Sequence, residues 1–107
     1  PDPTVRPLGV SDRPAWDRLW AGYLAFTGAL DPAVSEVTWT RLLDPAFPVF
    51  GLVAVDADDG PIGLTHYVLH PATWAVGPYC YLEDLFVDPD ASAGGVGRAL
   101  IEAVYVT

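Results

Sequence analysis

The feature that most constrains the fold is a dense run of apolar and aromatic residues at 79–87, which leads through a glycine-rich turn into a helix. Residues 88–90, Asp-Pro-Asp, end the run, and Gly94, Gly95 and Gly97 stand where the helix begins. The run is typical of a β-strand. The helix has an apolar face at helical spacing, made of Val96, Leu100, Ile101 and Val104. The core must therefore combine a sheet with a helix packed on it.

The rest of the chain supplies further strands and helices. The expected elements are, in order, a strand at residues 5–8, a helix from Ser11 or Asp12 to about residue 26, a helix at 34–43, strands at 49–55, 62–70 and 79–87, and the helix that begins near Gly95. An Asp- and Gly-rich turn at 56–60 joins two of these strands into an antiparallel hairpin. The order β-α-α-β-β-β-α predicts an α+β fold with a mixed, mostly antiparallel sheet flanked by helices. With 107 residues and no repeat or linker, a single domain over residues 1–107 is expected.

Composition excludes several classes of function. The net charge is −9, there is no lysine, and the five cations are arginines. Nucleic-acid binding needs a basic face that neutralises phosphates, so no nucleic-acid partner is expected. No apolar run reaches the length of a membrane span and there is no signal-peptide pattern, so we expect no membrane partner and a cytoplasmic location. An acidic surface suits a cationic amine, although acidity also serves solubility alone.

The cysteine, histidines and two of the tryptophans carry weaker expectations. Cys80 is the single cysteine and lies in an apolar run, so we expect a buried small residue. His66 and His70 fall at i and i+4 of a strand, roughly 13 Å apart on one face, which is too far for one metal ion. No metal site is expected. Trp39 and Trp74 are expected in the core or at its rim, with lining of an acceptor pocket as the alternative.

The turn before the last helix has the chemistry of an anion site. Glycines let the backbone bend tightly and approach a ligand. The unpaired N–H groups and the dipole at a helix start attract negative charge such as that of a pyrophosphate, and Arg98 can add a charge-assisted contact. The alternative is a helix that merely follows a flexible turn. The spacing matches neither G-x-G-x-x-G nor the lysine-containing phosphate loop, so dinucleotide and P-loop sites are disfavoured.

Residues 92–97, Ser-Ala-Gly-Gly-Val-Gly, form a short motif within this turn. The motif resembles [QR]-x-x-G-x-[GA], the signature of the GNAT superfamily of N-acetyltransferases, which stands between a fourth strand and a third helix. Gly95 and Gly97 take the glycine positions, and Ser92 stands where the family usually has Gln or Arg. That departure removes one polar contact to the coenzyme.

The strand before the motif strengthens the resemblance. Residues 81–89, Tyr-Leu-Glu-Asp-Leu-Phe-Val-Asp-Pro, are most similar to the fourth strand of the diamine and small-amine acetyltransferase branch. The order of elements agrees over most of the chain, while only residues 80–101 are specific. The family's C-terminal strands and helix are missing before Thr107, and we expect the protein to continue beyond this residue.

The resemblance implies an enzyme that uses acetyl-CoA as a cosubstrate, without a metal, and acetylates a primary amine by direct attack. The turn amides are implied to hold the pyrophosphate, and the strand backbone is implied to pair with the pantetheine arm. The implied coenzyme-binding residues are Leu85, Phe86, Val87, Ser92, Ala93, Gly94, Gly95, Val96, Gly97 and Arg98.

Acetylation also needs a base, because an alkylamine is mostly protonated at neutral pH. Strand alternation places Tyr81, Glu83, Leu85 and Val87 on one face and Leu82, Asp84 and Phe86 on the other. Only one of Glu83 and Asp84 can then face the cleft, unless a bulge intervenes. The resemblance favours Glu83 as the catalytic base; the alternative is that both acids are solvated edge residues. No general acid is assigned.

Three functions stay open at this point. The first is an acetyltransferase for a small-molecule amine, and the second acts on a protein N-terminus or a lysine. The third is a non-catalytic acyl-CoA-binding or interaction module with the GNAT fold, which Ser92 and the short C-terminus favour somewhat. Homodimers are common in the family, so a homodimer is a further expectation.

Overall fold

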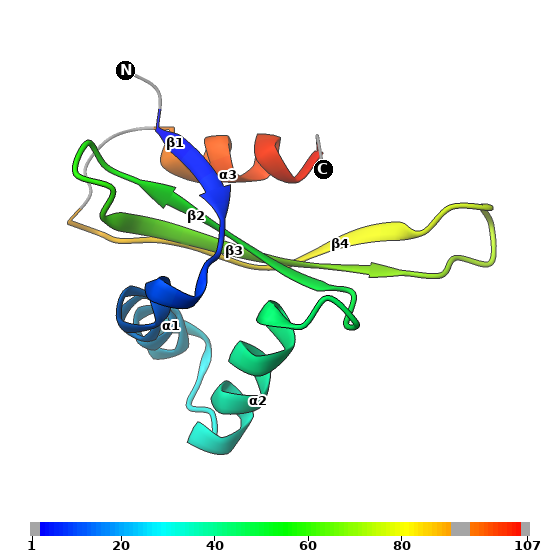
Figure 1. Cartoon of the computed structure of the whole chain (residues 1–107), viewed down its shortest axis with the longest axis horizontal. Coiled ribbons are helices and arrows are strands. Elements are labelled where there is room, and N and C mark those ends of the chain that lie inside the picture. Colours follow the sequence, from blue (N-terminus) through cyan, green and yellow to red (C-terminus); the bar gives the residue numbers. More distant parts are fainter. Residues whose placement is uncertain (1–2, 91–94, 106–107) are drawn as a thin grey trace.

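The computed structural model describes residues 3–90 and 95–105. In chain order its elements are β1 (Thr4–Pro7), a 3-10 turn (Val10–Asp12), α1 (Arg13–Thr27), α2 (Pro32–Leu43), β2 (Val49–Val55), β3 (Pro61–His70), β4 (Tyr79–Val87) and α3 (Val96–Tyr105). The expected α+β fold is confirmed, with its elements in the expected order (Figure 1). In the part of the chain that the structure describes, no helix combines the length and apolar character needed to cross a membrane.

The strands form one sheet in the order β1-β2-β3-β4, and each described pair is antiparallel. The turn between β2 and β3 is closed by Asp56, whose carboxylate accepts hydrogen bonds from the backbone N–H groups of Asp58 and Gly60. The far end of the β3–β4 hairpin extends past the helices (Figure 1). Among the described residues, β4 has no partner strand on its outer edge.

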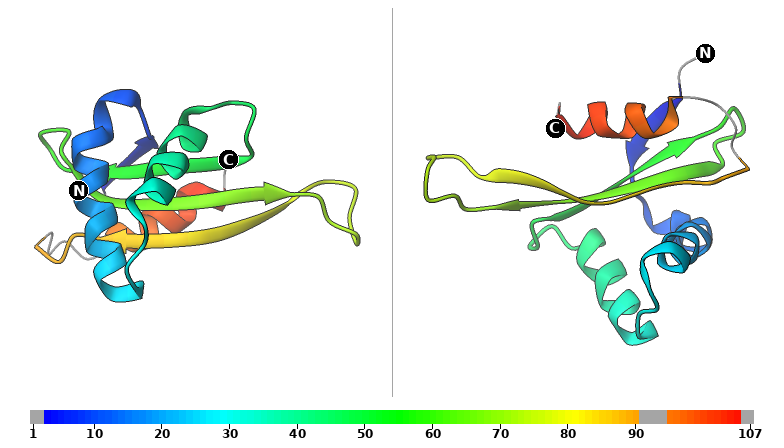
Figure 2. Two further views of the ribbon diagram at one scale, coloured as in Figure 1. Left: turned by 90° about the horizontal axis from the view of Figure 1, so that it is seen from below. Right: turned by 180° about the vertical axis from the view of Figure 1, so that it is seen from behind.

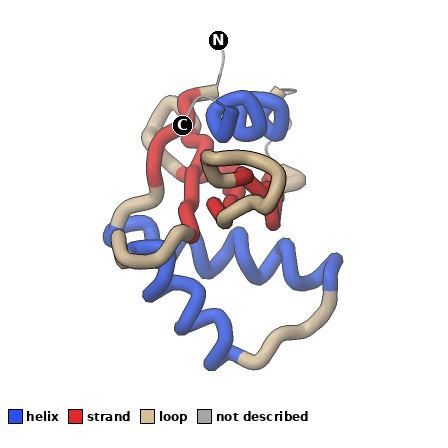
Figure 3. Tube along the Cα trace, turned by 90° about the vertical axis from the view of Figure 1, so that its right-hand side faces the viewer, coloured by secondary structure: helices blue, strands red, loops and turns tan. Residues whose placement is uncertain are grey.

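Helices cover both faces of the sheet: α1 and α2 lie on one side and α3 lies on the other (Figures 2 and 3). The core beneath α1 and α2 contains Trp16, Leu19, Trp20, Trp39, Val53, Val55 and Leu64. The core beneath α3 contains Leu52, Ala54, Tyr67, Val96, Leu100 and Val104. The period of two along β2 therefore sends alternate residues into different cores.

Two glycines let the helices approach the sheet closely. A Cβ at Gly22, within α1, would lie 2.6 Å from Cζ of Phe86, so the ring of this β4 residue packs directly on the helix backbone. A Cβ at Gly63, within β3, would lie 3.2 Å from side-chain atoms of Leu100 and Val96 in α3. Both contacts tie β3 and β4 to the helices on either side.

Two local expectations need correction. Asp12 holds the N-cap position of α1, but its side chain makes no capping bond. Its carboxylate instead accepts from the backbone N–H of Gly9 at 2.8 Å and from the guanidinium of Arg6. The expectation that Cys80 is buried is wrong: the residue is exposed. It lies near the start of β4, where it lines a hollow together with Ile101 and Tyr105 of α3.

Candidate active site

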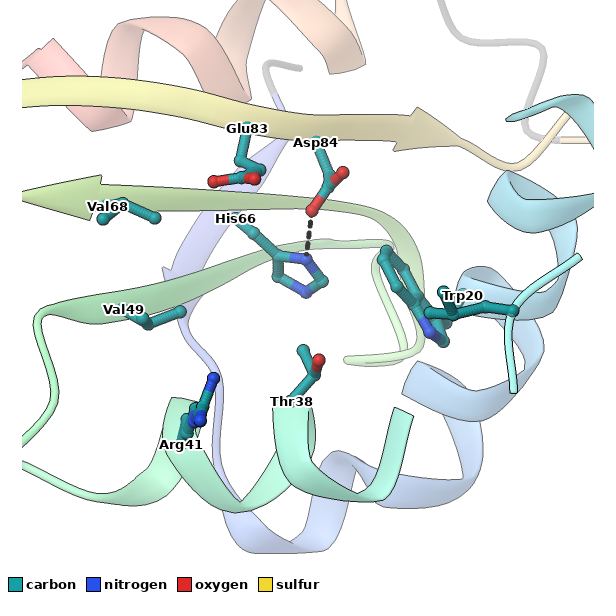
Figure 4. A pocket seen from close by; sticks show the side chains of 9 residues that line it. Trp20, Thr38, Arg41, Val49, His66, Val68, Glu83 and Asp84 are labelled. Atoms are coloured by element: carbon teal, nitrogen blue, oxygen red, sulfur yellow. Dashed lines mark hydrogen bonds and ion pairs between the residues drawn. The ribbon is translucent and has the colours of Figure 1, made fainter. Parts of the chain in front are cut away.

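A cavity of about 270 Å³ lies on the face of the sheet that α1 and α2 cover. It is lined by Trp20 of α1, Leu30 of the following loop, Thr38 and Arg41 of α2, Val49 of β2, His66 and Val68 of β3, and Glu83 and Asp84 of β4. Figure 4 shows the two acids on β4 and Arg41 on the opposite side of the cavity. Charged side chains of both signs therefore meet there among apolar neighbours.

A β-bulge turns both acids toward this cavity. Across the β3–β4 pairing His66 lies opposite Asp84 and the next residue of β3 lies opposite Leu82, so Glu83 has no partner. The extra residue breaks the alternation of the strand. Glu83 and Asp84 both line the cavity, while Leu82 and Leu85 both pack beneath α3. The strict alternation predicted from the sequence, with Glu83 and Leu85 on one face, is therefore wrong at this point.

A buried hydrogen-bond chain fixes His66 beside Asp84. Nε1 of Trp16 donates to Nε2 of His66 at 3.1 Å, and Nδ1 of His66 lies 3.0 Å from Oδ2 of Asp84. An indole N–H can only donate. Nε2 is therefore the acceptor, and Nδ1 carries the proton that is donated to Asp84. Because Trp16 is 0% and His66 3% exposed, the imidazole is locked in one tautomer with both nitrogens occupied.

Asp84 is an engaged carboxylate, whereas Glu83 is free. Burial acts to raise the pKa of Asp84, but hydrogen bonds from His66 and Tyr23 outweigh it and hold that pKa below its usual range. The bond to Asp84 is also the main reason that the pKa of Tyr23 is raised to about 12. Glu83 is exposed at the cavity and makes no hydrogen bond or ion pair with any described residue. Glu83 is thus the acid available to a ligand.

The strand residues predicted to contact a coenzyme point in different directions. Leu85 and Val87 pack in the cluster beneath α3, and Phe86 packs against the cluster beneath α1. Their backbone belongs to the strand whose outer edge has no partner among the described residues. A contact through the backbone is therefore compatible with all three positions, whereas a common contact through the side chains is not.

The turn residues predicted to hold a pyrophosphate are described from Gly95 onward; Ser92, Ala93 and Gly94 lie outside the described residues. Gly95 has a φ of 95°, in the left-handed region that favours glycine. Among the described residues, a Cβ at Gly97 would meet only Cγ2 of Val87, at 3.7 Å, which is an ordinary contact. Val96 begins α3, and Nε of Arg98 lies 2.8 Å from Oε1 of Glu102 on the exposed side of that helix.

Sequence reasoning did not assign Tyr23, His66 or Arg41 to the site. The pairing of strands 62–70 and 79–87 was the signal that could have placed His66 near the two acids. That signal depends on the register, and the bulge at Glu83 shifts the register by one residue. Arg41 lies on a different element, so no local pattern links it to the acids.

The other aromatic and histidine expectations have clear outcomes. Trp39 is buried in the core and Trp74 is 91% exposed; the cavity is lined by Trp20 instead. His70 is the exposed last residue of β3, where its Nδ1 lies 3.0 Å from the carbonyl oxygen of Pro71. Among residues 3–90 and 95–105, no three His, Cys, Asp or Glu side chains come together in a way that could hold a metal ion.

Comparison with known families identifies one match. The model of the acetyltransferase (GNAT) family matches residues 15–105. A D-amino-acid N-acetyltransferase of Saccharomyces cerevisiae is 38% identical over 103 residues, an alignment that covers 94% of this chain and 64% of the relative. The chain thus spans less than two thirds of the length of this curated relative.

Solved structures share the fold at lower identity. An integron cassette protein from the mobile metagenome of Cole Harbour Salt Marsh has a TM-score of 0.81 and 22% identity, over 95% of this chain and 67% of that one. The ribosomal-protein-alanine N-acetyltransferase of Brucella melitensis biovar Abortus 2308 has a TM-score of 0.76 and 20% identity, over 99% of this chain and 71% of that one.

Proposed function

Because the chain belongs to the GNAT family of acetyltransferases, we propose that it transfers the acetyl group of acetyl-CoA to the primary amine of a small molecule by direct attack. Glu83 carries this proposal. It is a carboxylate without a partner among the described residues, set into a cavity by a bulge. The same strand leads into the glycine turn at which the coenzyme is proposed to bind.

The coenzyme side of the proposal uses the end of β4 and the start of α3. The N–H groups of Val96, Gly97 and Arg98 hold the pyrophosphate, because the first amides of a helix have no partners within it. The positive φ of Gly95, which a side chain would disfavour, supports a close approach of the phosphates to the backbone. The unpartnered edge of β4 offers backbone groups to the pantetheine arm, as in β-augmentation.

The acceptor enters as an ammonium ion, since an alkylamine is mostly protonated at neutral pH. Glu83 takes one proton, directly or through a water molecule, and the freed nitrogen attacks the carbonyl carbon of the thioester. The new C–N bond replaces the C–S bond, and the departing thiolate receives the second proton that the nitrogen gives up. Asp84 does not compete as the base, because His66 and Tyr23 already hydrogen-bond to it.

The size of the cavity and the curated relative both support a small acceptor. About 270 Å³ lies just below the roughly 300–1,000 Å³ of typical small-molecule sites. The relative is a D-amino-acid N-acetyltransferase. We therefore propose an acceptor of amino-acid size in preference to a peptide, which needs an open groove.

Two further parts of the proposal concern the protein's surroundings. A reducing compartment such as the cytoplasm suits a chain whose single cysteine is exposed and free. A homodimer would give the exposed end of the β3–β4 hairpin a surface to pack on.

The test is acetylation of a panel of amines, amino acids and peptides by the full chain, with release of the coenzyme thiol as the readout. Glu83→Gln should lower kcat by about 10²–10⁴-fold and leave acetyl-CoA affinity unchanged. Asp58→Asn removes an exposed acid on the β2–β3 turn and should keep full turnover. Binding of acetyl-CoA without turnover of any acceptor would overturn the proposal and identify a coenzyme-binding module. Turnover of peptides alone would move the assignment to protein acetylation.

A further inference from the structure

We propose that Arg41 binds the carboxylate of an amino-acid acceptor whose ammonium group faces Glu83. The inference rests on the proposed function and deepens it by assigning a residue of the acceptor site. It makes Arg41 the residue that selects zwitterionic acceptors over plain amines and diamines.

Arg41 differs from every other arginine of the chain. The remaining four all form ion pairs: Arg6 with Asp12 and Asp59, Arg13 with Asp17 and Glu36, Arg18 with Asp88, and Arg98 with Glu102. The guanidinium of Arg41 makes no ion pair or hydrogen bond with a described residue. The chain has 14 acidic residues for five cations, so a partner for each arginine is easy to supply. Among the described residues, the one guanidinium without a carboxylate partner lines the cavity.

Arg41 nevertheless has one aromatic contact. Its Cζ lies 5.3 Å from the centroid of the Phe47 ring, which supports one face of the guanidinium plane. Figure 4 shows the side chain rising from α2 on the side of the cavity opposite β4. A planar guanidinium presents paired donors that match a carboxylate in a bidentate contact. Arg41 is therefore an exposed arginine that contacts Phe47 and whose hydrogen-bond donors are unused by any described residue.

Glu83 is the counterpart on the other wall. Both Glu83 and Arg41 are exposed at the cavity, and no ion pair joins them. A ligand with a positive and a negative end can pair with the carboxylate of Glu83 and the guanidinium of Arg41 at the same time. The apolar remainder of the cavity, formed by Trp20, Val49 and Val68 among others, leaves room for a third, uncharged substituent. An α-amino acid has these three parts.

The arrangement also predicts which acceptors are rejected. A monoamine without a carboxylate leaves Arg41 unused and binds more weakly. A diamine, the acceptor class suggested by the resemblance of residues 81–89, brings a second cation toward the guanidinium and is repelled. Specificity thus comes from one attraction and one repulsion at the same side chain.

The experiment compares amino acids with their carboxamides, which keep the amine and lose the negative charge. With the full chain, the amino acid is expected to have a kcat/KM about 10- to 100-fold above that of its amide, as befits charge-assisted bonds. Arg41→Gln should remove that preference by raising KM for the acid, with kcat and the kinetics of the amide nearly unchanged. Arg41→Lys should restore part of it. Arg13→Gln, the same loss of charge at a paired surface arginine, should leave the preference intact.

The outcomes separate the two proposals. If the wild type acetylates no amine, the proposed function fails. If it acetylates acid and amide equally, or if Arg41→Gln slows both equally, the enzyme stands and the role of Arg41 is wrong. Because the comparison of acid with amide uses the wild type, equal turnover of the two would overturn the role of Arg41 even if the variant does not fold.

Discussion

The two faces of the sheet are packed with different chemistry. Beneath α3 the core is apolar except for Tyr67 and the buried Thr65, whose hydroxyl donates to the backbone carbonyl oxygen of Asp84, and α3 is held close by the absence of a side chain at Gly63. Beneath α1 and α2 the core contains stacked tryptophans, and a buried histidine hydrogen-bonds to one of them and to Asp84. One sheet therefore carries a mainly apolar core on one face and, on the other, a core that also positions ionisable side chains.

The two faces therefore differ in the interactions that stabilise them and in the chemistry that their side chains can perform. The α3 face is stabilised by burial of apolar surface, which has no preferred direction and leaves no group free to act. On the other face the chain from Trp16 through His66 to Asp84 fixes the direction of buried donors and acceptors, and Glu83 and Arg41 line the cavity without a partner among the described residues. Substitutions on the two faces should therefore differ in kind as well as in size.

The largest effect is expected from Leu100→Ala on the α3 face. Leu100 is fully buried, so its truncation leaves a cavity between α3 and the sheet and should cost about 2–5 kcal/mol of unfolding free energy. Chemical denaturation measures this. Tyr105→Ala, on the exposed end of the same helix, is the control and should change stability by less than about 0.5 kcal/mol. Equal effects would mean that α3 is not packed as described.

The next effect is expected from His66→Leu on the other face. Leucine fills much of the volume but leaves the buried indole N–H of Trp16 without an acceptor, at a cost of about 1–3 kcal/mol. Asp84 keeps its bond from Tyr23 and its access to the cavity. Thermal unfolding provides the measurement, with His70→Leu as the control at the exposed end of the same strand. A variant as stable as the wild type would refute the need for the hydrogen-bond chain.

Gly22→Ala should lower the free energy of unfolding somewhat less than His66→Leu does. The added methyl group would lie 2.6 Å from the ring of Phe86 and force α1 or β4 to move, at about 1–3 kcal/mol. The higher helix propensity of alanine offsets up to about 1 kcal/mol of this loss of stability. Gly97→Ala makes the same change in α3, where the nearest contact is ordinary, and should be neutral or stabilising. The difference between the two variants in urea midpoint isolates the close approach.

The smallest effect concerns pH. The folded-state pKa of Asp84 lies below its unfolded value, so its contribution to stability is complete above about pH 4 and disappears as the pH falls through the folded pKa. Asp84→Asn should therefore show a flatter loss of stability in acid than the wild type. Some loss will remain, because the pKa of Asp12 is lowered by Arg6 in the same direction. Identical pH profiles would mean that Asp84 is not engaged by His66 and Tyr23.

The sequence predicted the α3 face better than the other face. Strands 49–55 and 79–87 have the expected bounds, and the apolar spacing of Val96, Leu100 and Val104 is the stripe that α3 buries. The sequence period predicts buried positions well, because buried apolar residues recur at the period of the helix or strand that carries them. The residues of such an apolar interface can therefore be predicted from the sequence of each helix or strand by itself.

The cavity could be predicted only in part. Glu83 was singled out by resemblance, and its place in the cavity depends on a bulge that residues 81–85 do not reveal. The link from Trp16 to His66 joins positions fifty residues apart, and the link from Arg41 to the cavity depends on the path of α2. Such contacts arise from tertiary packing, so no spacing within one element could show them. The role of Glu83 stays a prediction.

The bulge has a consequence for insertions and deletions. With Glu83 removed, Leu82, Asp84 and Leu85 would alternate between the two faces as in a regular strand, and every other side chain of β4 would keep its present side. Deletion of this single codon should thus yield a folded domain with a straight β4 and no free acid at the cavity. The pairing of β3 with β4 does not require Glu83. This extra residue contributes a carboxylate to the cavity and no contact that the sheet needs.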